Sequence, residues 1–359
     1  MANSSVGLYN FRFELINKLI EQGFEVCISL PESAEDRNVK LMINAGVKHI
    51  QTHINRRGMN PIEDLKLIKE YKRIIRNINP EVILSYTIKP NIYGAFAASK
   101  CKKPLIMNIT GIGTSLMNSK SKQLVIKLYK YACQKSKFVF FQNESNYSLF
   151  TSMKLVDYQK TKIIPGSGVN TSKFKPVNTV KQDNIIRFLF IGRLMKEKGI
   201  EEYLNAAKNL TNKYPNVEFQ VLGPFEEEKY KIILGESKYD RINYLGISND
   251  VRNEIVNIDC VVNPSYHEGM SNVLLEAAAM GKSLIASNIP GCKEIIEDGY
   301  NGYLFEVKSV TSLEEKLIRY INLDNKEKDL FGENSRKKVN DEFDRNIVIG
   351  EYMRAINRI

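Results

Sequence analysis

The chain has 359 residues, of which 43% are hydrophobic and 26% are charged, a composition typical of folded protein rather than disordered protein. This length is comfortable for two domains. No apolar run reaches the roughly 18 residues of a membrane-spanning helix, and the first residues lack the layout of a secretory signal. Five cysteines without CxxC spacing and three histidines favour reduced thiols and predict no metal site.

The formal net charge of +11 is unevenly distributed. Residues 1–178 carry 27 basic and 12 acidic side chains, whereas residues 179–359 carry 25 and 29. Residues 82–143 hold ten lysines and no acidic residue. A one-sided field of this kind attracts anionic partners, such as nucleic acid, anionic lipid or a phosphorylated acceptor. The alternative is a solvated face that only adds solubility.

The chain alternates short β-rich runs with longer amphipathic stretches, which predicts parallel sheets covered by helices. At residues 7–23 a glycine loop and a helix are expected, although a Rossmann-like domain should begin with a strand. That first strand is therefore expected to be a stub or truncated. The strands expected in the first half are residues 25–30, 49–54, 82–87, 104–110 and 138–143, with helices at 61–77 and 121–134.

The second half of the chain repeats this alternation of strands and helices. Its expected strands are residues 187–192, 218–223, 242–246, 260–265 and 283–288. Residues 164–178 are rich in Gly, Ser, Pro and Asn and predict a linker. The chain is thus expected to be an α/β protein with an N-terminal Rossmann-like domain at 1–170 and a second at 171–340. A C-terminal helix at 341–359 is expected to pack back toward the first domain.

Two carboxylates flank the expected helix start in residues 266–282 (YHEGMSNVLLEAAAMGK). Ser271 is a plausible N-cap for a helix over 272–280. Glu268 then lies on a loop at the carboxyl end of a strand, and Glu276 lies in the helix. Ligands bind at that edge of open parallel sheets, so Glu276 could accept ribose hydroxyls and Glu268 could contact a sugar. The alternative is a pair of ordinary surface glutamates.

Two cations follow an earlier strand in residues 191–200 (IGRLMKEKGI). Arg193 follows Gly192 at the strand exit, and Lys198 precedes the next expected helix. Arginine offers phosphate a planar fork and lysine a point charge, so the two could stabilise a departing nucleoside diphosphate. The alternative is two surface cations near a helix start. No DxD triplet occurs, so a metal-bridged donor is not expected.

Together these segments resemble the GT-B glycosyltransferases of family 4. An EGxSNxxLE helix follows a GRLxKxKG turn by about 75 residues, and residues 165–170, 287–305 and 7–23 also look like segments of that family. The resemblance implies two Rossmann-like domains whose parallel sheets face each other across a cleft. It also implies a metal-independent enzyme that transfers a sugar from a nucleotide-diphosphate donor with retention of configuration.

The resemblance also implies roles for individual residues. Arg193 and Lys198 match the donor-phosphate cations, and Glu268 and Glu276 match the two glutamates of the EX7E motif, the second binding ribose. Further donor-binding positions are Gly7, Gly192, Met270, Ser271, Asn272 and Val273. Arg193, Lys198 and Glu268 are the expected catalytic residues, and no metal or other cofactor is expected.

Residues 87–94, 108–116 and 141–146 look like the CapM- and PglA-type branch of the family. Those enzymes add a sugar, often an N-acetylhexosamine, to an undecaprenyl-diphosphate-linked acceptor at the cytoplasmic membrane face. The expected donor is a UDP-sugar, with GDP left open, and the expected location is peripheral on the inner face of the cell membrane. Candidate contacts to the acceptor or an anionic lipid surface are Lys89, Arg12, Thr110, Lys120, Lys122 and Lys127.

Three rivals remain open at this point. A sugar-nucleotide epimerase or a phosphorylase would share the architecture, but its acid/base carboxylates or pyridoxal lysine are not apparent. A non-catalytic sugar-nucleotide-binding paralogue could act as partner of another transferase. A nucleic-acid binder is suggested by charge alone, and the chain lacks a basic motif interleaved with aromatic residues, so no nucleic-acid partner is expected.

Overall fold

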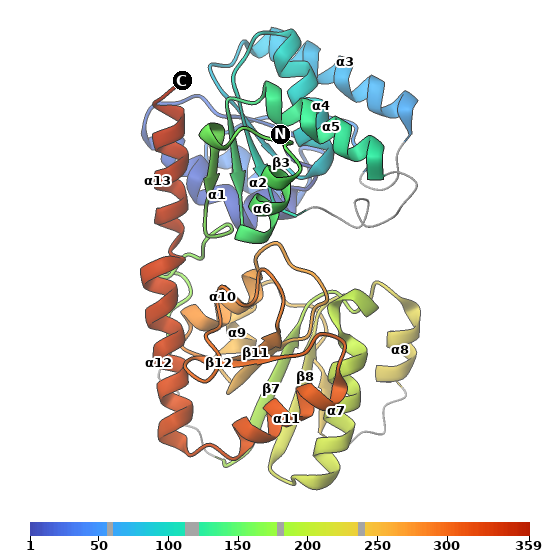
Figure 1. The fold of residues 1–359 in the computed structure, drawn as a ribbon, viewed down its shortest axis with the longest axis vertical. Helices are drawn as coiled ribbons and strands as arrows, with labels where there is room; N and C mark the ends of the chain where they lie inside the picture. The colour runs from blue at the N-terminus through green and yellow to red at the C-terminus, as the bar shows by residue number, and fades with distance from the viewer. Residues whose placement is uncertain (56–59, 112–121, 178–182, 236–240) are drawn as a thin grey trace. The chain divides into compact units, whose positions relative to one another are not determined.

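The computed structural model describes residues 1–55, 60–111, 122–177, 183–235 and 241–359. The chain forms two compact units, each described here by itself. The first unit comprises Met1–Ser167 together with Ile347–Ile359, and the second comprises Gly168–Asn346 (Figure 1). Over the described residues, every helix is too short or too polar to cross a membrane.

The second unit is built on a six-stranded parallel sheet with the order β12-β11-β10-β7-β8-β9. The strands are β7 (Ile186–Ile191), β8 (Val217–Leu222), β9 (Ile242–Tyr244), β10 (Cys260–Asn263), β11 (Ser283–Ser287) and β12 (Gly302–Phe305). Successive strands add toward one edge from β7 to β9, and the chain then returns to place β10 on the other side of β7. The order therefore reverses between β7 and β10, which is where open α/β sheets bind ligands.

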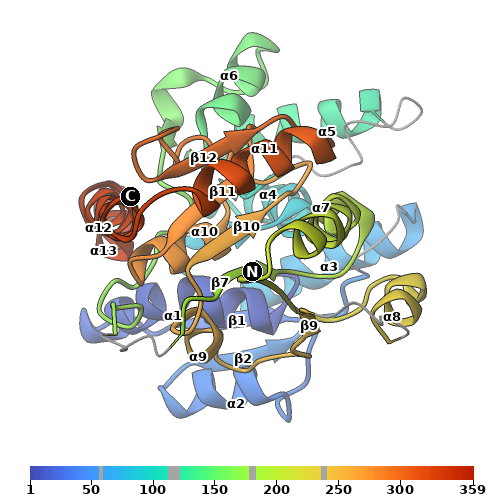
Figure 2. The ribbon, with the colours of Figure 1, turned by 90° about the horizontal axis from the view of Figure 1, so that it is seen from below.

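Helices cover both faces of this sheet. They are η3 (Lys196–Lys198, a 3-10 turn), α7 (Ile200–Lys213), α8 (Glu228–Gly235), α9 (Arg252–Ile255), α10 (Asn272–Ala279), α11 (Val310–Ile321) and α12 (Asn325–Glu342). Figure 2 shows α7 and α11 on one side of the sheet and α9, α10 and α12 on the other. Each side has its own apolar core, with Phe188 and Tyr203 in one and Leu189 and Leu274 in the other. Neighbouring residues of β7 thus point to opposite faces, as a strand buried on both sides requires.

The first unit has the same kind of architecture. Its strands are β1 (Cys27–Leu30), β2 (Lys48–Gln51), β3 (Ile83–Tyr86), β4 (Leu105–Ile109), β5 (Phe138–Phe141) and β6 (Thr161–Ile163), all paired in parallel. Its helices are α1 (Ser5–Glu21), α2 (Arg37–Asn44), α3 (Pro61–Ile78), α4 (Ile88–Lys100), α5 (Lys122–Lys135), α6 (Glu144–Ser152), the 3-10 turn η2 (Tyr158–Lys160) and most of α13 (Arg345–Ile356). One core lies beneath α3 to α6, and the other beneath α1, α2 and α13.

Residues Met1 and Ala2 lie between β1 and β3 in place of a full strand. The backbone N–H of Ala2 donates to the carbonyl of Ser29 at 3.2 Å, and the backbone nitrogen of Met1 donates to the carbonyl of Leu84 at 2.8 Å. The N–H of Tyr86 in turn donates to the carbonyl of Met1 at 3.0 Å. This two-residue stub joins the β1–β2 pair to the four strands beginning with β3.

The expected architecture of two Rossmann-like α/β units is confirmed, with three local differences. β6 and β12 are strands that the sequence analysis did not predict. The expected terminal helix at 341–359 is in fact the end of α12 and the whole of α13, separated at Phe343 and Asp344. The break has a clear cause, because the N–H of Val169 donates to the carbonyl of Phe343 and the N–H of Arg345 donates to the carbonyl of Val169, both at 2.9 Å.

Candidate active site

The two expected cations, Arg193 and Lys198, lie just beyond the carboxyl end of β7. β7 is apolar and largely buried up to Ile191, and Gly192 follows it. Arg193 leaves the strand with 52% of its side chain exposed, and its nearest carboxylate is that of Glu226 at 3.6 Å. Lys198 ends the 3-10 turn η3, directly before α7. An arginine this exposed and this loosely paired is available to an incoming anion.

The two expected carboxylates follow the carboxyl end of β10, where Glu268 lies in the loop and Glu276 lies in the capped helix α10. Ser271 caps α10, with its Oγ accepting from the N–H of Leu274 at 3.4 Å. Asn263, the last residue of β10, donates from Nδ2 to the same Oγ at 2.6 Å. The N–H groups of Asn272 and Val273 lie in the first turn, where no intrahelical acceptor exists. The start of α10 can therefore donate to an anionic group.

Lys198 and Glu268 form an ion pair across the point where the strand order reverses. Nζ of Lys198 lies 2.6 Å from Oε1 of Glu268, and the two side chains are 26% and 15% exposed. They are brought together because β7 and β10 are hydrogen-bonded neighbours and parallel strands end at the same edge. The structure thus brings together two of the residues that the sequence predicted to meet.

Close backbone packing fixes the distance between these two turns. Gly199 has a φ of +71°, and a Cβ there would lie 2.0 Å from the carbonyl oxygen of Pro264. The N–H of Tyr266 donates to the carbonyl of Glu197 at 3.0 Å. On the other side, a Cβ on Gly291 would lie 2.9 Å from the carbonyl oxygen of Glu268. The loop that carries Glu268 is therefore packed on both sides by backbone, with no space for side chains there.

Glu276 is a half-buried carboxylate in α10. Burial raises its pKa to about 7, against the opposing effect of the positive charges on Arg345 and Lys173. Among the described residues, none forms a hydrogen bond or an ion pair with this carboxylate. A desolvated carboxylate without a partner at the ligand-binding edge of a parallel sheet is a candidate for binding a ligand hydroxyl.

The remaining residues expected at the donor site have mixed environments. Met270 is 6% exposed and belongs to the apolar core beneath α10, so it presents mainly backbone. Asn272 and Val273 are half-buried. Gly7 does not lie in a glycine loop, as expected, but in the first turn of α1, where its N–H donates to Ser4 Oγ at 3.3 Å. The expectation of a loop at Gly7 was wrong because Ser4 caps the helix ahead of it.

The candidate acceptor and membrane contacts differ widely in exposure. Arg12 is only 4% exposed, and its guanidinium lies 4.8 Å from the ring centre of Tyr86. The expectation that Arg12 meets an anionic surface was therefore wrong for this structure. Lys89 is 13% exposed and forms a 3.0 Å ion pair with Asp64, so its charge is already compensated inside the unit.

The other candidates on the first unit remain accessible or lie outside the described residues. Thr110 follows β4 and is half-buried. Lys122 and Lys127 are exposed on α5. Lys120 lies outside the described residues. Only the two α5 lysines among these candidates thus present free charge on the described surface.

Sequence reasoning missed two buried carboxylates, one in each unit, that accept hydrogen bonds from tyrosine hydroxyls. Asp64 holds both Lys89 and the hydroxyl of Tyr93, the latter at 2.6 Å. Tyr266 donates from its hydroxyl to Glu202 Oε1 at 2.7 Å. Both carboxylates are buried acids in helices, and their positions on the apolar side of each helix were the only signal in the sequence.

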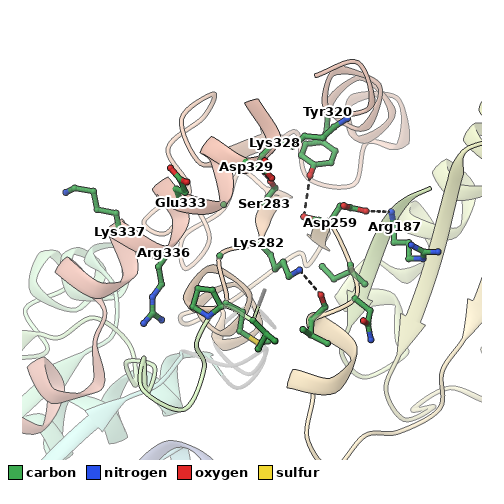
Figure 3. A pocket seen from close by; sticks show the side chains of 18 of the residues that line it. Arg187, Asp259, Lys282, Ser283, Tyr320, Lys328, Asp329, Glu333, Arg336 and Lys337 are labelled. Atoms are coloured by element: carbon green, nitrogen blue, oxygen red, sulfur yellow. Dashed lines mark hydrogen bonds between the residues drawn. The ribbon is translucent and has the colours of Figure 1, made fainter. Parts of the chain in front are cut away.

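The large cavity in Figure 3 is separate from this site. It has a volume of about 1060 Å³ and lies at the opposite edge of the sheet, where Arg187, Asp259 and Ser283 mark the beginnings of β7, β10 and β11. Its cations have partners within the unit, since Arg336 donates to three backbone carbonyls and Lys282 Nζ donates to the carbonyl of Val256. Its position and its paired cations distinguish it from the group of residues at the carboxyl ends of β7 and β10.

The second unit is thus a doubly wound parallel domain with two cations, two carboxylates and a capped helix start at the reversal of strand order, which is where such domains bind anionic ligands. Comparison with known families agrees. Residues 171–338 match the family described as "Glycosyl transferases group 1", and residues 3–143 match "Glycosyl transferase 4-like". The chain belongs to these family 4 glycosyltransferases of the GT-B fold, in the CapM- and PglA-like branch, and is an enzyme.

Similar proteins cover nearly the full length. The N,N'-diacetylbacillosaminyl-diphospho-undecaprenol alpha-1,3-N-acetylgalactosaminyltransferase of Campylobacter jejuni is 26% identical over 100% of this chain and 98% of its own. The capsular polysaccharide biosynthesis glycosyltransferase CapM of Staphylococcus aureus is 24% identical over 84% and 83%. The crystal structure of Anabaena HepE with UDP and glucose aligns with a TM-score of 0.79 at 18% identity, over 97% of this chain and 95% of that one.

Proposed function

We propose that this enzyme transfers a sugar, an N-acetylhexosamine or a related sugar, from a UDP-sugar to a polyprenyl-diphosphate-linked saccharide, with retention of anomeric configuration. The observation that carries the proposal is the Lys198–Glu268 pair, 2.6 Å apart at the reversal of strand order. In this pair a cation suited to phosphate lies beside a carboxylate suited to sugar hydroxyls, at one edge of the sheet. Arg193 adds a second cation at the same edge.

In the proposed reaction the bond between the anomeric carbon and the donor's β-phosphate breaks. An acceptor hydroxyl oxygen forms a new bond to that carbon on the same face, and its proton passes to a β-phosphate oxygen of the departing UDP. Arg193 and Lys198 stabilise the charge that develops on this leaving group. Glu268 orients the sugar through its hydroxyls. The step uses no metal, because the two cations supply the positive charge.

Recognition of the nucleoside is assigned to α10 and to the end of β9. Glu276 accepts hydrogen bonds from both ribose hydroxyls, which gives its carboxylate the partners it otherwise lacks. The N–H groups of Asn272 and Val273 donate to the diphosphate. Ile247, 70% exposed just after β9, offers an apolar surface to the base at the same edge of the sheet.

The acceptor assignment is supported by the relatives, whose names include a diphospho-undecaprenol substrate. A lipid-linked acceptor requires the enzyme to work at a membrane surface, for which we propose the inner face of the cell membrane. Lys122 and Lys127 are exposed on α5, within the stretch from 82 to 143 that has no acidic residue. Each such lysine close to an anionic leaflet contributes about 1 kcal/mol to attachment.

The proposal is tested with a panel of UDP- and GDP-sugars, measured by thermal shift and by release of nucleotide. Transfer to short polyprenyl-diphosphate saccharides is then measured with the donors that bind. We expect UDP-N-acetylhexosamine to bind and to be turned over only with the lipid-linked acceptor, with the anomeric configuration retained by NMR. Binding of a UDP-sugar with no turnover on any acceptor would instead support a non-catalytic partner of another transferase.

A further inference from the structure

A buried hydrogen bond joins the segment that carries Glu268 to the segment that carries Lys198. The hydroxyl of Tyr266 donates to Oε1 of Glu202 at 2.7 Å. Tyr266 is 7% exposed and Glu202 is 8% exposed. Tyr266 lies two residues before Glu268, and Glu202 lies four residues after Lys198 in the first turn of α7. The bond therefore bridges the same two segments that the Lys198–Glu268 ion pair bridges.

Burying this tyrosine–carboxylate pair costs more free energy than burying two apolar side chains of the same shape would. The second carboxylate oxygen of Glu202, Oε2, is buried and has no hydrogen-bond partner among the described residues. A buried carboxylate with incomplete hydrogen bonding is unfavourable compared with an apolar pair of the same shape. Its position in the first turn of α7 offsets part of that penalty through the helix dipole. The pair thus does more than fill space, because its hydrogen bond is directional. It fixes the orientation of the loop that carries Tyr266 relative to the first turn of α7.

The two connections between the segments respond differently to donor binding. A diphosphate that binds Lys198 competes directly with Glu268 for the ammonium group. The Lys198–Glu268 pair therefore weakens at the moment when Glu268 has to meet the sugar. The Tyr266–Glu202 bond is buried away from solvent and contains no group that binds the donor, so it persists in the complex.

We infer that Tyr266 and Glu202 are positioning residues, whose buried hydrogen bond keeps the loop bearing Glu268 at the turn bearing Lys198 while the donor occupies the site. The backbone contacts of Gly199 with Pro264 and of Tyr266 with Glu197 fix where this loop starts. The side-chain bond fixes the direction in which the chain then leaves toward Glu268. This inference rests on the proposed function for its kinetic consequence.

The chain offers a matched control. Tyr230 is fully buried and donates from its hydroxyl to Oε1 of Glu201 at 3.0 Å. Glu201 is the neighbour of Glu202 in the first turn of α7. Tyr230→Phe therefore removes a tyrosine hydrogen bond to the same helix turn, but from α8 rather than from the loop that carries Glu268, and Glu201 keeps its ion pair with Lys229 at 2.8 Å.

The experiment compares Tyr266→Phe, Tyr230→Phe, Glu202→Gln and Glu202→Leu in the full chain. For Tyr266→Phe and Glu202→Leu we expect kcat to fall about tenfold, which corresponds to ~1.4 kcal/mol in the activation barrier, with the Kd for UDP changed less than about twofold. Glu202→Gln keeps an acceptor oxygen and should retain near wild-type kcat. Tyr230→Phe should lower Tm but leave kcat unchanged.

A readout independent of turnover is amide hydrogen exchange with saturating UDP. Exchange over residues 266–271 should rise in Tyr266→Phe and stay at the wild-type level in Tyr230→Phe. Equal kinetic and exchange effects in the two variants, or a Glu202→Gln variant as slow as Glu202→Leu, would overturn the inference. If the wild-type enzyme turned over no donor, the proposed function would fail, and the exchange comparison would still decide the positioning role.

Discussion

Replacement of Glu276 by glutamine should make the donor-free enzyme more stable at high pH. Burial raises the pKa of Glu276 from its ordinary value of 4.5 to about 7. Between these two values the unfolded chain has released the proton and the native protein retains it, so the stability of the native state falls as pH rises. A difference of roughly 2.5 pKa units corresponds to about 3 kcal/mol. This loss of native-state stability is absent below pH 4.5 and complete above pH 7.

Glu276→Gln removes this titration while it keeps the shape of the side chain. Its unfolding free energy should match that of the wild type near pH 5 and exceed it by up to about 3 kcal/mol at pH 8. For a domain of this size, each kcal/mol corresponds to roughly 2–4 °C in Tm. The measurement is thermal and urea unfolding at pH 5, 6, 7 and 8, with Glu315→Gln as control, because Glu315 is exposed on α11.

Addition of UDP should narrow the difference in stability between the variant and the wild type at pH 8. At about 100 times its Kd a ligand stabilises the native state by about 2.7 kcal/mol, and the variant has lost the carboxylate that accepts the ribose hydroxyls. Wild type with UDP should therefore gain more than Glu276→Gln with UDP. A difference in Tm that is the same at every pH, or a wild type that is the more stable protein at pH 8 without ligand, would refute the reasoning.

Three further predictions follow from the same site. The donor KM should be about tenfold higher at pH 6 than at pH 8, because binding to ribose needs the ionised form of Glu276, and a flat profile would contradict this. Lys198→Ala should lower kcat more than it raises the donor KM, and turnover at the wild-type rate would contradict a role in stabilising the leaving group. Gly199→Ala should lower the free energy of unfolding by about 2 kcal/mol or more, because its Cβ would lie 2.0 Å from the carbonyl oxygen of Pro264.

The alternation of strands and helices was predictable because local patterns carry it. Residues 187–192 form an apolar run of strand length, and Ser271 caps a helix close to where its sequence signal predicts one. The meeting of Lys198 and Glu268 followed from the same patterns, since each residue lies just beyond the carboxyl end of a parallel strand. Such features depend on neighbours in sequence, where propensity and periodicity are informative.

The features that were missed depend on contacts between distant parts of the chain. Arg12 seemed a surface cation, yet it packs against the rings of Tyr86 and Tyr352. Nothing near Arg12 in the sequence signals a tyrosine 340 residues later. The break between α12 and α13 likewise depends on Val169, which pairs with backbone on both sides of Asp344. Tertiary pairing of this kind overrides a continuous helical pattern.

The electrostatics of the donor-free site explain how binding can favour the transition state in the proposed reaction. Lys198 and Glu268 neutralise each other, and Glu276 has a pKa of about 7, so before the donor binds the exposed Arg193 carries the main unbalanced charge of these four residues. An incoming diphosphate draws Lys198 away from Glu268. The carboxylate of Glu268 is thereby released beside a sugar whose anomeric carbon gains positive charge as UDP departs. Interactions that strengthen during bond breaking lower the barrier more than uniform binding does. When the Lys198–Glu268 ion pair separates, Lys198 becomes available to the leaving diphosphate and Glu268 becomes available to the positively charged sugar.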